Sequence, residues 1–396
     1  MKKIGFVTPW YGKNIPGGAE ALLRGLVKKL HESGVELEVL TTCVKQFTSD
    51  WNTNFHKAGY RHEDGIAIRR FEVRKRDTEM FDNVNYKLMR GMRLSAVEES
   101  VFIKEMVNSP DLYRWMAAQK DDYSLFVFIP YMFGTTYYGS LICPEKSVLI
   151  PCFHDEAYVY MEIFKKQFSK VKGMVFNSHP EKVLAERIYD LSNVETAILG
   201  MGIDTNANYN PEAFADKYKI KKPFILYAGR KDPGKNIHLL IKYFQIYKSE
   251  TNHPLQLVLI GGGEVNIPEE IKNDVFDLGF VPTQDKFDAY TAAALLCQPS
   301  TNESFSIVLM ESWLCGRPAL VHADCPVTKN FVQDSNGGLY FRTFHEFVGC
   351  VNYILGNAKE ATQMGKLGQR YVRDRFSREV VTKNYISFFK KLSVGT

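Results

Sequence analysis

Short apolar runs alternate with amphipathic stretches along most of this chain. Residues 3–8 form an apolar run typical of a buried parallel strand, and residues 36–41 form another. Between them, leucine and valine recur at helical spacing over residues 19–33, and Gly34 ends the predicted helix. Two strands joined by a helix imply a parallel sheet with a right-handed crossover.

The same alternation restarts after a polar segment, residues 204–222, which we interpret as a linker. Before it, the pattern predicts further strands at residues 125–129, 147–150 and 174–176 and a helix at 180–190. After it, the pattern predicts strands at 224–228, 255–260, 275–281, 295–298 and 319–322, and helices at 237–247, 284–292 and 304–314. In residues 42–119 the hydrophobic positions show no clear helix or strand periodicity.

This alternation predicts an α/β fold of two doubly wound, Rossmann-like parallel-sheet domains in series. We place the N-terminal domain at residues 1–203 and the C-terminal domain at 204–376. Ligands bind at the carboxyl ends of parallel strands, so we expect the two sheets to face each other across a ligand-binding cleft.

The composition argues against two classes of function, nucleic-acid binding and structural zinc binding. Hydrophobic residues make up 45% and charged residues 24%, as in ordinary globular proteins. The formal charge of +5, from 50 basic and 45 acidic residues, is too small for a dedicated nucleic-acid binder. None of the 7 cysteines forms a CxxC pair, so we expect a reducing compartment and no structural zinc.

The N-terminal apolar run covers only residues 4–7. A signal peptide needs about 7–15 apolar residues and a membrane span about 20. We therefore expect a soluble cytoplasmic protein, and peripheral attachment to the inner face of the membrane stays open.

The strongest chemical signal follows the predicted strand at 295–298. Glu303 and Glu311 are eight residues apart around a predicted helix start, so they lie about 12 Å apart along the axis on nearly one face. The amides of Ser304, Phe305 and Ser306 would be free to bind phosphate. Two carboxylates and a phosphate site suit an elongated diphosphate such as a nucleotide sugar. The simpler interpretation is an ordinary helix-face glutamate and a glutamate that favours the helix dipole.

Two glycine-containing turns follow other strands. Gly229 and Arg230, with Lys235 at the next helix start, offer close backbone approach and cations for phosphate, although a solvated basic turn would look the same. Gly17 and Gly18 could present amides to a ligand or serve only a tight turn. Neither GxGxxG nor GxxxxGK[ST] spacing is present, which disfavours dinucleotide and P-loop sites.

Three further stretches have two interpretations each. His154-Asp155-Glu156 could supply a base, a metal ligand or a binding residue, or be an exposed loop; no HExxH or DxD accompanies it. The basic residues between Arg69 and Arg76 suggest a solvated face or contact with anionic lipid. The amphipathic residues 376–392 suggest a helix that closes the core or, less simply, a membrane anchor.

Together these stretches resemble the family 4 retaining glycosyltransferases, which have the GT-B fold. The resemblance covers nearly the whole chain and rests on the ordered motifs Gly17-Gly18-Ala19-Glu20, His154-Asp155, Gly202-Ile203-Asp204, Gly229-Arg230, Lys235-Asn236, the strand 257–262, Leu278-Gly279-Phe280-Val281, Glu303-x7-Glu311 and Gly316-Arg317-Pro318.

The resemblance implies a role for each matching residue. Arg230 and Lys235 would neutralise the donor diphosphate, and Glu303 would bind the transferred sugar. The other implied donor-binding groups are Glu311 at the ribose, Phe280 and Val281 at the base, the amides of Ser304, Phe305, Ser306 and Ile307 at the phosphates, Gly229 beside Arg230, and the closing loop of Gly17 and Gly18. His154 would lie beside the reacting carbon.

The implied catalytic set is Glu303, His154, Arg230 and Lys235, with no metal and no cofactor. The family also implies that the C-terminal domain binds the donor and the N-terminal domain the acceptor. It further implies that a last helix, at about residues 377–396, packs back on the N-terminal domain. Many members have glycine where this chain has Ser304 and Ser306, so sugar specificity does not transfer.

The expected activity is transfer of a hexose from a UDP- or GDP-sugar to a glycan or lipid-linked glycan, with retained configuration, in surface polysaccharide synthesis. A sugar phosphorylase or a nucleotide-sugar epimerase on the same fold is the alternative. A non-catalytic sugar-binding protein is a third possibility, which the absence of a signal peptide disfavours. No nucleic-acid partner is expected.

Overall fold

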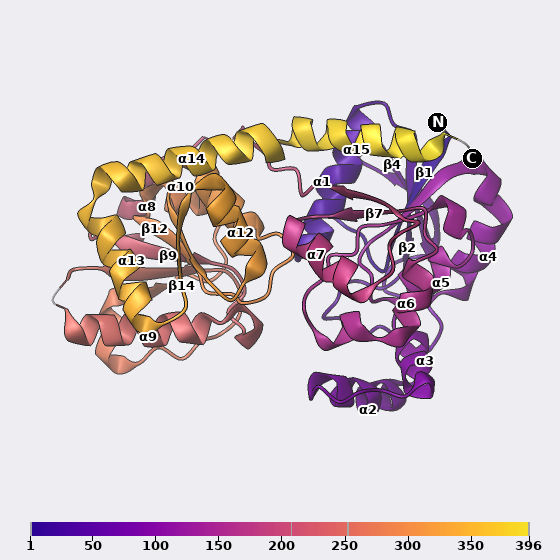
Figure 1. The fold of residues 1–396 in the computed structure, drawn as a ribbon, viewed down its shortest axis with the longest axis horizontal. Helices are drawn as coiled ribbons and strands as arrows, with labels where there is room; N and C mark the ends of the chain where they lie inside the picture. The colour runs from indigo at the N-terminus through magenta and orange to yellow at the C-terminus, as the bar shows by residue number, and fades with distance from the viewer. Residues whose placement is uncertain (1, 207, 252, 395–396) are drawn as a thin grey trace. The chain divides into compact units, whose positions relative to one another are not determined.

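The computed structural model describes residues 2–206, 208–251 and 253–394 (Figure 1). The chain folds into two compact units. Unit 1 comprises residues 1–202 together with 381–396, and unit 2 comprises residues 203–380.

Unit 1 contains an eight-stranded sheet among its described residues, in the order β3-β4-β2-β1-β5-β6-β7-β8. All neighbouring pairs are parallel except β3 and β4, which are antiparallel. The strands are β1 (Lys3–Thr8), β2 (Leu37–Thr42), β3 (Gly59–Glu63), β4 (Ile66–Phe71), β5 (Tyr123–Phe128), β6 (Ser147–Leu149), β7 (Gly173–Phe176) and β8 (Glu195–Ile198). The strand order reverses between β1 and β5, which is the point where doubly wound sheets bind ligands.

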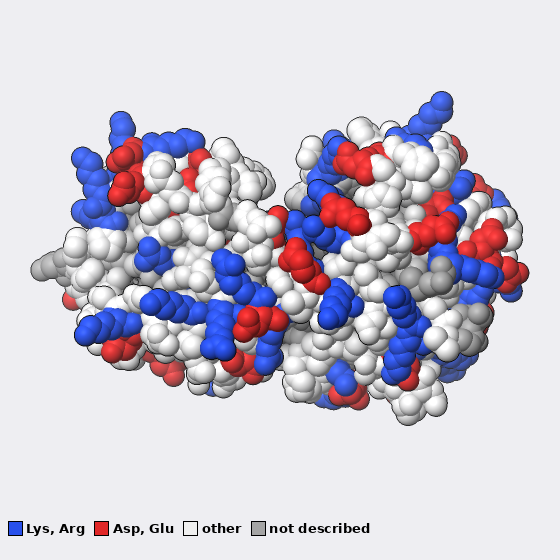
Figure 2. Space-filling view, turned by 90° about the horizontal axis from the view of Figure 1, so that it is seen from above, with Lys and Arg blue, Asp and Glu red and all other residues white. Residues whose placement is uncertain are grey.

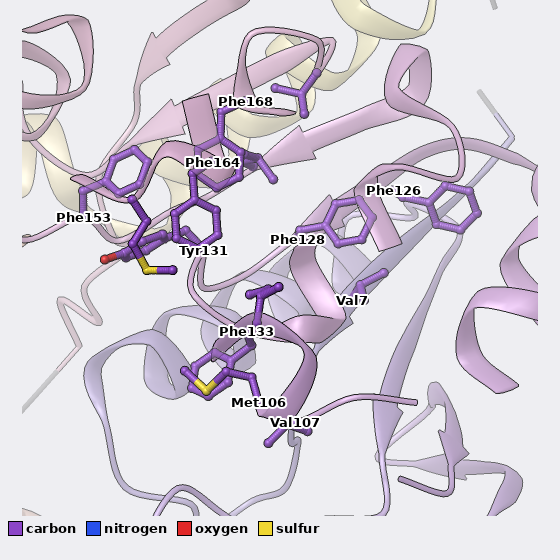
Figure 3. Packing of buried hydrophobic residues seen from close by; sticks show 14 of the residues in the cluster. Val7, Met106, Val107, Phe126, Phe128, Tyr131, Phe133, Phe153, Phe164 and Phe168 are labelled. Carbon is purple, nitrogen blue, oxygen red and sulfur yellow. The ribbon is translucent and has the colours of Figure 1, made fainter. Parts of the chain in front are cut away.

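The helices of unit 1 connect these strands. They are α1 (Gly18–Glu32), α2 (Thr78–Met89), α3 (Ala96–Glu105), α4 (Pro110–Gln119), α5 (Gly134–Ser140), α6 (Glu162–Phe168) and α7 (His179–Ile188), with 3₁₀ turns η1 (Lys120–Asp122), η2 (Pro144–Lys146) and η3 (Ala157–Tyr160). An aromatic cluster fills one side of the sheet, and Tyr131, Phe153, Phe164 and Phe168 converge there (Figure 3).

Unit 2 contains a fully parallel six-stranded sheet among its described residues, in the order β11-β10-β9-β12-β13-β14. The strands are β9 (Phe224–Ala228), β10 (Gln256–Ile260), β11 (Val275–Asp277), β12 (Leu295–Gln298), β13 (Ala319–His322) and β14 (Gly338–Phe341). The order reverses between β9 and β12. Continuous apolar sequence in these strands reflects burial on both faces.

The helices of unit 2 cover both faces of its sheet (Figure 1). They are α8 (Pro211–Tyr218), α9 (Ile237–Glu250), α10 (Thr283–Ala292), α11 (Ile307–Leu314), α12 (Pro326–Ser335), α13 (Phe344–Gly356) and α14 (Ala358–Phe376), with 3₁₀ turns η4 (Pro233–Lys235) and η5 (Glu269–Asp274). The prediction of two doubly wound α/β domains is confirmed.

The C-terminal helix of the chain is interrupted at Ser377. After α14 the chain forms a bridge between Ser377 and Ile203, and α15 (Arg378–Ser393) follows. From Val381 onward α15 belongs to unit 1, where Phe389 makes an edge contact with Phe6 of β1, with ring centroids 6.3 Å apart. Its apolar face therefore lies against the core of unit 1, which fits the core-closing interpretation.

Two predictions of local structure were wrong, and a third stretch, for which no elements were predicted, is regular. The segment at 204–222 contains α8, whose N-cap Asn210 accepts a bond from the amide of Ala213 at 3.1 Å, so it is not simply a linker. The predicted strand at 275–281 ends at Asp277. Residues 42–119 hold two strands and three helices, which the aromatic and charged side chains of this stretch obscured.

Candidate functional site

The loops that follow β9 and β12 meet at the switch point of unit 2. Asn236, at the end of the first loop, donates a side-chain hydrogen bond to the carbonyl of Pro299 in the second at 3.0 Å. Asn236 itself has a left-handed backbone, with φ of 56°. This contact holds the end of η4 against the segment that leads to α11.

Glycines let the loop after β10 lie against the loop after β9. A Cβ on Gly261, where φ is 121°, would lie 2.0 Å from the carbonyl oxygen of Gly229. The amide of Lys231 bonds the carbonyl of Gly262 at 2.8 Å. The main chain therefore approaches closely here, and a side chain at Gly261 would separate the two loops.

Lys235 and Glu303 form an ion pair at this switch point. The Nζ of Lys235 donates to Oε1 of Glu303 at 2.7 Å, and the side chains are 24% and 9% exposed. Asp232 caps η4 by accepting the amide of Lys235 at 3.1 Å, which fixes the main chain of the lysine. The side-chain amide of Gln298 lies 3.4 Å from the same carboxylate oxygen. The structure thus brings two of the predicted catalytic residues into contact.

The helix after Glu303 begins later than predicted. Ser306 has a φ of 74°, which is left-handed and outside the helical region, and α11 begins at Ile307. The expectation that Ser304 starts the helix, with Glu303 and Glu311 on one continuous face, was therefore wrong. The unpaired helix amides are those of Ser306, Ile307 and the following residues, while Ser304 and Phe305 lie in the preceding turn.

Glu311 lies within α11 and already has two partners. Its Oε1 accepts from Nζ of Lys286 at 2.6 Å, and its Oε2 accepts from the hydroxyl of Tyr290 at 3.0 Å. Burial, and to a lesser extent the Glu311 carboxylate, raises the pKa of Tyr290 well above its usual value. The phenol therefore keeps its proton and donates it to Glu311 in a hydrogen bond. Sequence analysis missed Lys286 and Tyr290, although their spacing of four residues places them on one face of α10.

The two basic residues after Gly229 differ in environment. The side chain of Arg230 is 69% exposed and lies 3.3 Å from Asp232. Lys231, which sequence analysis did not single out, is buried and pairs with Asp277 at the end of β11. Arg230 is therefore available to a ligand at the loop surface, whereas Lys231 ties two strand ends together.

Phe280 is the most exposed aromatic residue of the candidate set. It is 81% exposed, and its ring covers Gly262, where an added Cβ would lie 2.5 Å from the ring. Val281 follows it and is partly buried. The outer face of the Phe280 ring can stack against a flat ligand group.

In unit 1, the Gly17-Gly18 turn follows β1 at the second switch point. Gly17 has a φ of 133°, and a Cβ there would lie 2.0 Å from a carboxylate oxygen of Glu20. Glu20 accepts the indole N–H of Trp10 at 2.7 Å, and Arg24 bonds the carbonyl of Ile15 at 2.8 Å. These bonds tie the whole turn to α1.

His154 lies after β6 in unit 1 and is 35% exposed. Its Nδ1 is 3.8 Å from Oε1 of Glu156. The neighbouring Asp155 accepts from the hydroxyl of Tyr160 at 2.6 Å and pairs with Arg187 at 3.2 Å. The imidazole of His154 is thus accessible, whereas the carboxylate of Asp155 already has two side-chain partners.

The basic stretch of residues 69–76 is not a solvated face. Arg70 is 2% exposed and donates to the carbonyl of Tyr11 at 2.7 Å, and burial lowers its pKa to about 10. Arg74 pairs with a buried carboxylate, and Arg69 and Arg76 lie over aromatic rings. The arginines of this stretch thus contact other residues of unit 1, so the interpretation as a simple solvated face was wrong, although Lys75 is exposed. Contact with anionic lipid stays a prediction.

Charged side chains are mixed in sign on the molecular surface. On the face shown in Figure 2, Lys and Arg side chains are interspersed with Asp and Glu within each unit. In the part of the chain that the structure describes, no group of three or more His, Cys, Asp or Glu side chains is placed to hold a metal ion. No helix among residues 2–206, 208–251 and 253–394 is long and apolar enough to cross a membrane.

Two doubly wound units, each with a mostly parallel sheet, are the architecture of the GT-B class of fold. Residues 210–371, which are nearly all of unit 2, match the family model described as "Glycosyl transferases group 1". Unit 2 is therefore similar to group 1 glycosyltransferase domains.

Known proteins with similar sequences cover parts of this chain. An O-antigen chain mannosyltransferase B from Escherichia coli is 30% identical over 113 residues, 26% of this chain and 30% of the relative. A trehalose synthase from Rubrobacter xylanophilus is 24% identical over 188 residues, 44% of each chain. The chain thus spans less than half the length of these two relatives.

Solved structures resemble the whole chain. A sucrose-phosphate synthase from Thermosynechococcus elongatus aligns over 100% of both chains, with a TM-score of 0.72 and 15% identity. HepE from Anabaena, solved in complex with UDP-glucose, aligns over 99% of this chain and 100% of its own, with a TM-score of 0.68 and 15% identity. These likenesses establish the fold.

Proposed function

We propose that this chain is a family 4 retaining glycosyltransferase that moves a hexose from a UDP- or GDP-sugar to a glycan or lipid-linked glycan. The observation that carries the proposal is the 2.7 Å ion pair of Lys235 and Glu303 at the switch point of unit 2. Lys235, whose main chain is fixed by the capped turn, can bind a phosphate oxygen in place of Glu303. The Glu303 carboxylate is then free to accept a hydrogen bond from a sugar hydroxyl.

Unit 2 supplies the groups that a nucleoside diphosphate sugar requires. Lys235 and Arg230 carry positive charge after β9, and the free amides at the start of α11 attract phosphate. Glu311, held by Lys286 and Tyr290, would bind the ribose hydroxyls, and Phe280 would meet the base. The UDP and UDP-glucose complexes of HepE support this choice of donor.

In the proposed reaction, the bond between the anomeric carbon and the diphosphate oxygen breaks. A bond from that carbon to an acceptor hydroxyl oxygen forms on the same face, and the hydroxyl proton passes to the departing phosphate. Fixed cations and helix amides stabilise the developing charge without a protein nucleophile or a metal. We assign the acceptor and the catalytic His154 to unit 1.

The mannosyltransferase named for O-antigen chains supports a setting in surface polysaccharide synthesis. The proposal therefore includes a cytoplasmic location, with the acceptor presented at the inner face of the membrane.

A thermal-shift screen of UDP-, GDP- and ADP-sugars tests donor binding, because a ligand that binds only the folded state raises the unfolding temperature. Turnover of the stabilising donor is then measured with and without a glycan acceptor and with inorganic phosphate. Transfer that depends on the acceptor supports the proposal. Turnover that requires phosphate, or that occurs without an acceptor, would instead identify a phosphorylase or an epimerase.

A further inference from the structure

The backbone just before His154 is strained. Cys152 has a φ of 58°, a left-handed conformation that a residue other than glycine, asparagine or aspartate seldom adopts. Such a conformation persists only where the surrounding structure holds it, and it occurs preferentially at functional sites. The segment 152–154 follows β6, whose carboxyl end lies beside β5 and β7.

Phe153 anchors this segment on one side. Its ring lies in the aromatic cluster of unit 1, with centroids 4.8 Å from Tyr131 and 5.4 Å from Tyr189 (Figure 3). The side chain therefore points into the core, while the next residue, His154, remains partly exposed.

Glu181 of α7 holds the same residue by its main chain. Its Oε1 accepts the amide of Phe153 at 2.7 Å, and its Oε2 accepts the amide of Asn177 at 2.6 Å. The carboxyl group thus joins the segments that follow β6 and β7. Asn177 adds a side-chain contact of 3.5 Å to the sulfur of Cys152.

Glu181 is 2% exposed, and no ion pair to it is found among the described residues. Burying a carboxyl without a cation is costly, so its presence calls for an explanation. Capping of α7 explains part of this arrangement, since Ser178 caps the helix and Glu181, three residues further on, accepts the amide of Asn177 just before it. An acid that serves only the cap has no need of the Phe153 amide, which comes from a different segment.

We propose that Glu181 is a positioning residue for His154: it fixes the strained backbone next to His154 and so sets where the imidazole lies. This inference rests on the proposed function, in which His154 is one of the catalytic residues.

The test compares Glu181→Gln with a matched control. Each carboxyl oxygen of Glu181 accepts one backbone amide. The side-chain nitrogen of glutamine donates hydrogen bonds and cannot accept one, so Glu181→Gln should lose one of the two bonds, whether or not the glutamate is protonated. Glu99 provides the control, because this buried glutamate of unit 1 also accepts two backbone amides, from Glu162 at 2.9 Å and Ile163 at 2.8 Å. Glu99→Gln makes the same chemical change at α6.

We expect Glu181→Gln to lower kcat by between about tenfold and hundredfold with little change in donor KM, as small misplacements of a reacting group do. Glu99→Gln should leave kcat near the wild-type value. In a His154→Ala background, Glu181→Gln should have little further effect. Equal kcat values for the two glutamine variants, or effects of Glu181→Gln and His154→Ala that multiply, would overturn the inference.

A second measurement does not depend on activity. Hydrogen exchange of the Phe153 amide should be faster in Glu181→Gln and unchanged in Glu99→Gln. If the enzyme turns over no nucleotide sugar, the proposed function fails, and unchanged exchange would separately refute the role of Glu181.

If Glu181→Gln does not fold, Glu181→Asp addresses the same contact, because a carboxylate that is shorter by one methylene should not reach the amides of both Phe153 and Asn177. We expect faster exchange at Phe153 and lower kcat in this variant. Wild-type exchange and kcat in Glu181→Asp would contradict the inference.

Discussion

Two buried glutamates of unit 1, Glu181 and Glu99, are held differently from the two glutamates of the unit 2 site. In unit 1, Glu181 and Glu99 accept backbone amides that cannot move without unfolding local structure. In unit 2, Glu303 and Glu311 pair with the side chains of Lys235 and Lys286. A lysine side chain can rotate away, so a ligand can replace it as the partner of the carboxylate. The first arrangement suits positioning and the second suits ligand exchange.

The largest expected effect tests the exchangeable pair. Lys235→Ala should lower kcat/KM by roughly 100- to 1000-fold, because it removes a fixed cation that stabilises the departing diphosphate. Steady-state kinetics with the donor found in the thermal-shift screen measure this. Lys242→Ala, on the exposed face of α9, is the control and should be near wild type. A wild-type rate in Lys235→Ala would mean that the pair is only structural.

Glu181, which accepts two backbone amides, should make the free energy of unfolding depend on pH. Burial raises the pKa of Glu181 from its usual 4.5 to about 7, against the opposing effect of its amide bonds and of His154. The folded state therefore binds a proton that the unfolded state releases, so the free energy of unfolding should fall as pH rises from about 4.5 to about 7 and then level off. The loss should be on the order of 3 kcal/mol.

Urea unfolding at a series of pH values measures this effect. The fall should be absent in Glu181→Gln and retained in Glu99→Gln. Besides His154, the titratable groups facing Glu181 are Cys152 and Tyr385, and burial raises the pKa of both well above their usual values, so neither should titrate in this window. A fall that persists in Glu181→Gln would show that another group is responsible.

A smaller effect is expected at Glu311. Glu311→Gln should raise the donor KM about tenfold or more, the usual cost of losing a charged hydrogen bond, with a lesser change in kcat. Lys286→Met should raise it less, because Tyr290 still orients the carboxylate. If instead Lys286→Met lowered the KM, Lys286 would be competing with the donor for Glu311.

The smallest effect is expected at Arg230. Its side chain is 69% exposed and paired with Asp232, so water screens its charge. Arg230→Ala should lower kcat/KM less than Lys235→Ala does, by about tenfold, and the loss should shrink as salt is added. An Arg230→Ala loss as large as that of Lys235→Ala would imply that the turn closes over the diphosphate and excludes water.

Five of the strands described in unit 2 were predictable because buried parallel strands are continuous apolar runs between turn formers, whereas the partly exposed β14 was not predicted. The strands at 224–228, 295–298 and 319–322 have the predicted bounds. The candidate site was found in part for a related reason: charged and small residues directly after such strands must lie at the binding edge. Lys235 and Glu303, 68 residues apart, were both identified in this way, but their contact was not.

By itself, then, the sequence determined the α/β class, the first five strands of unit 2 with the three helices predicted between them, and the segments that reach the carboxyl edge, because periodicity and turn chemistry are local. Only the tertiary structure decided which of the adjacent Arg230 and Lys231 is buried, that α11 starts after a left-handed Ser306, and that Glu181 reaches the amide before His154. Burial and partner choice depend on residues distant in the chain, and no local pattern encodes them.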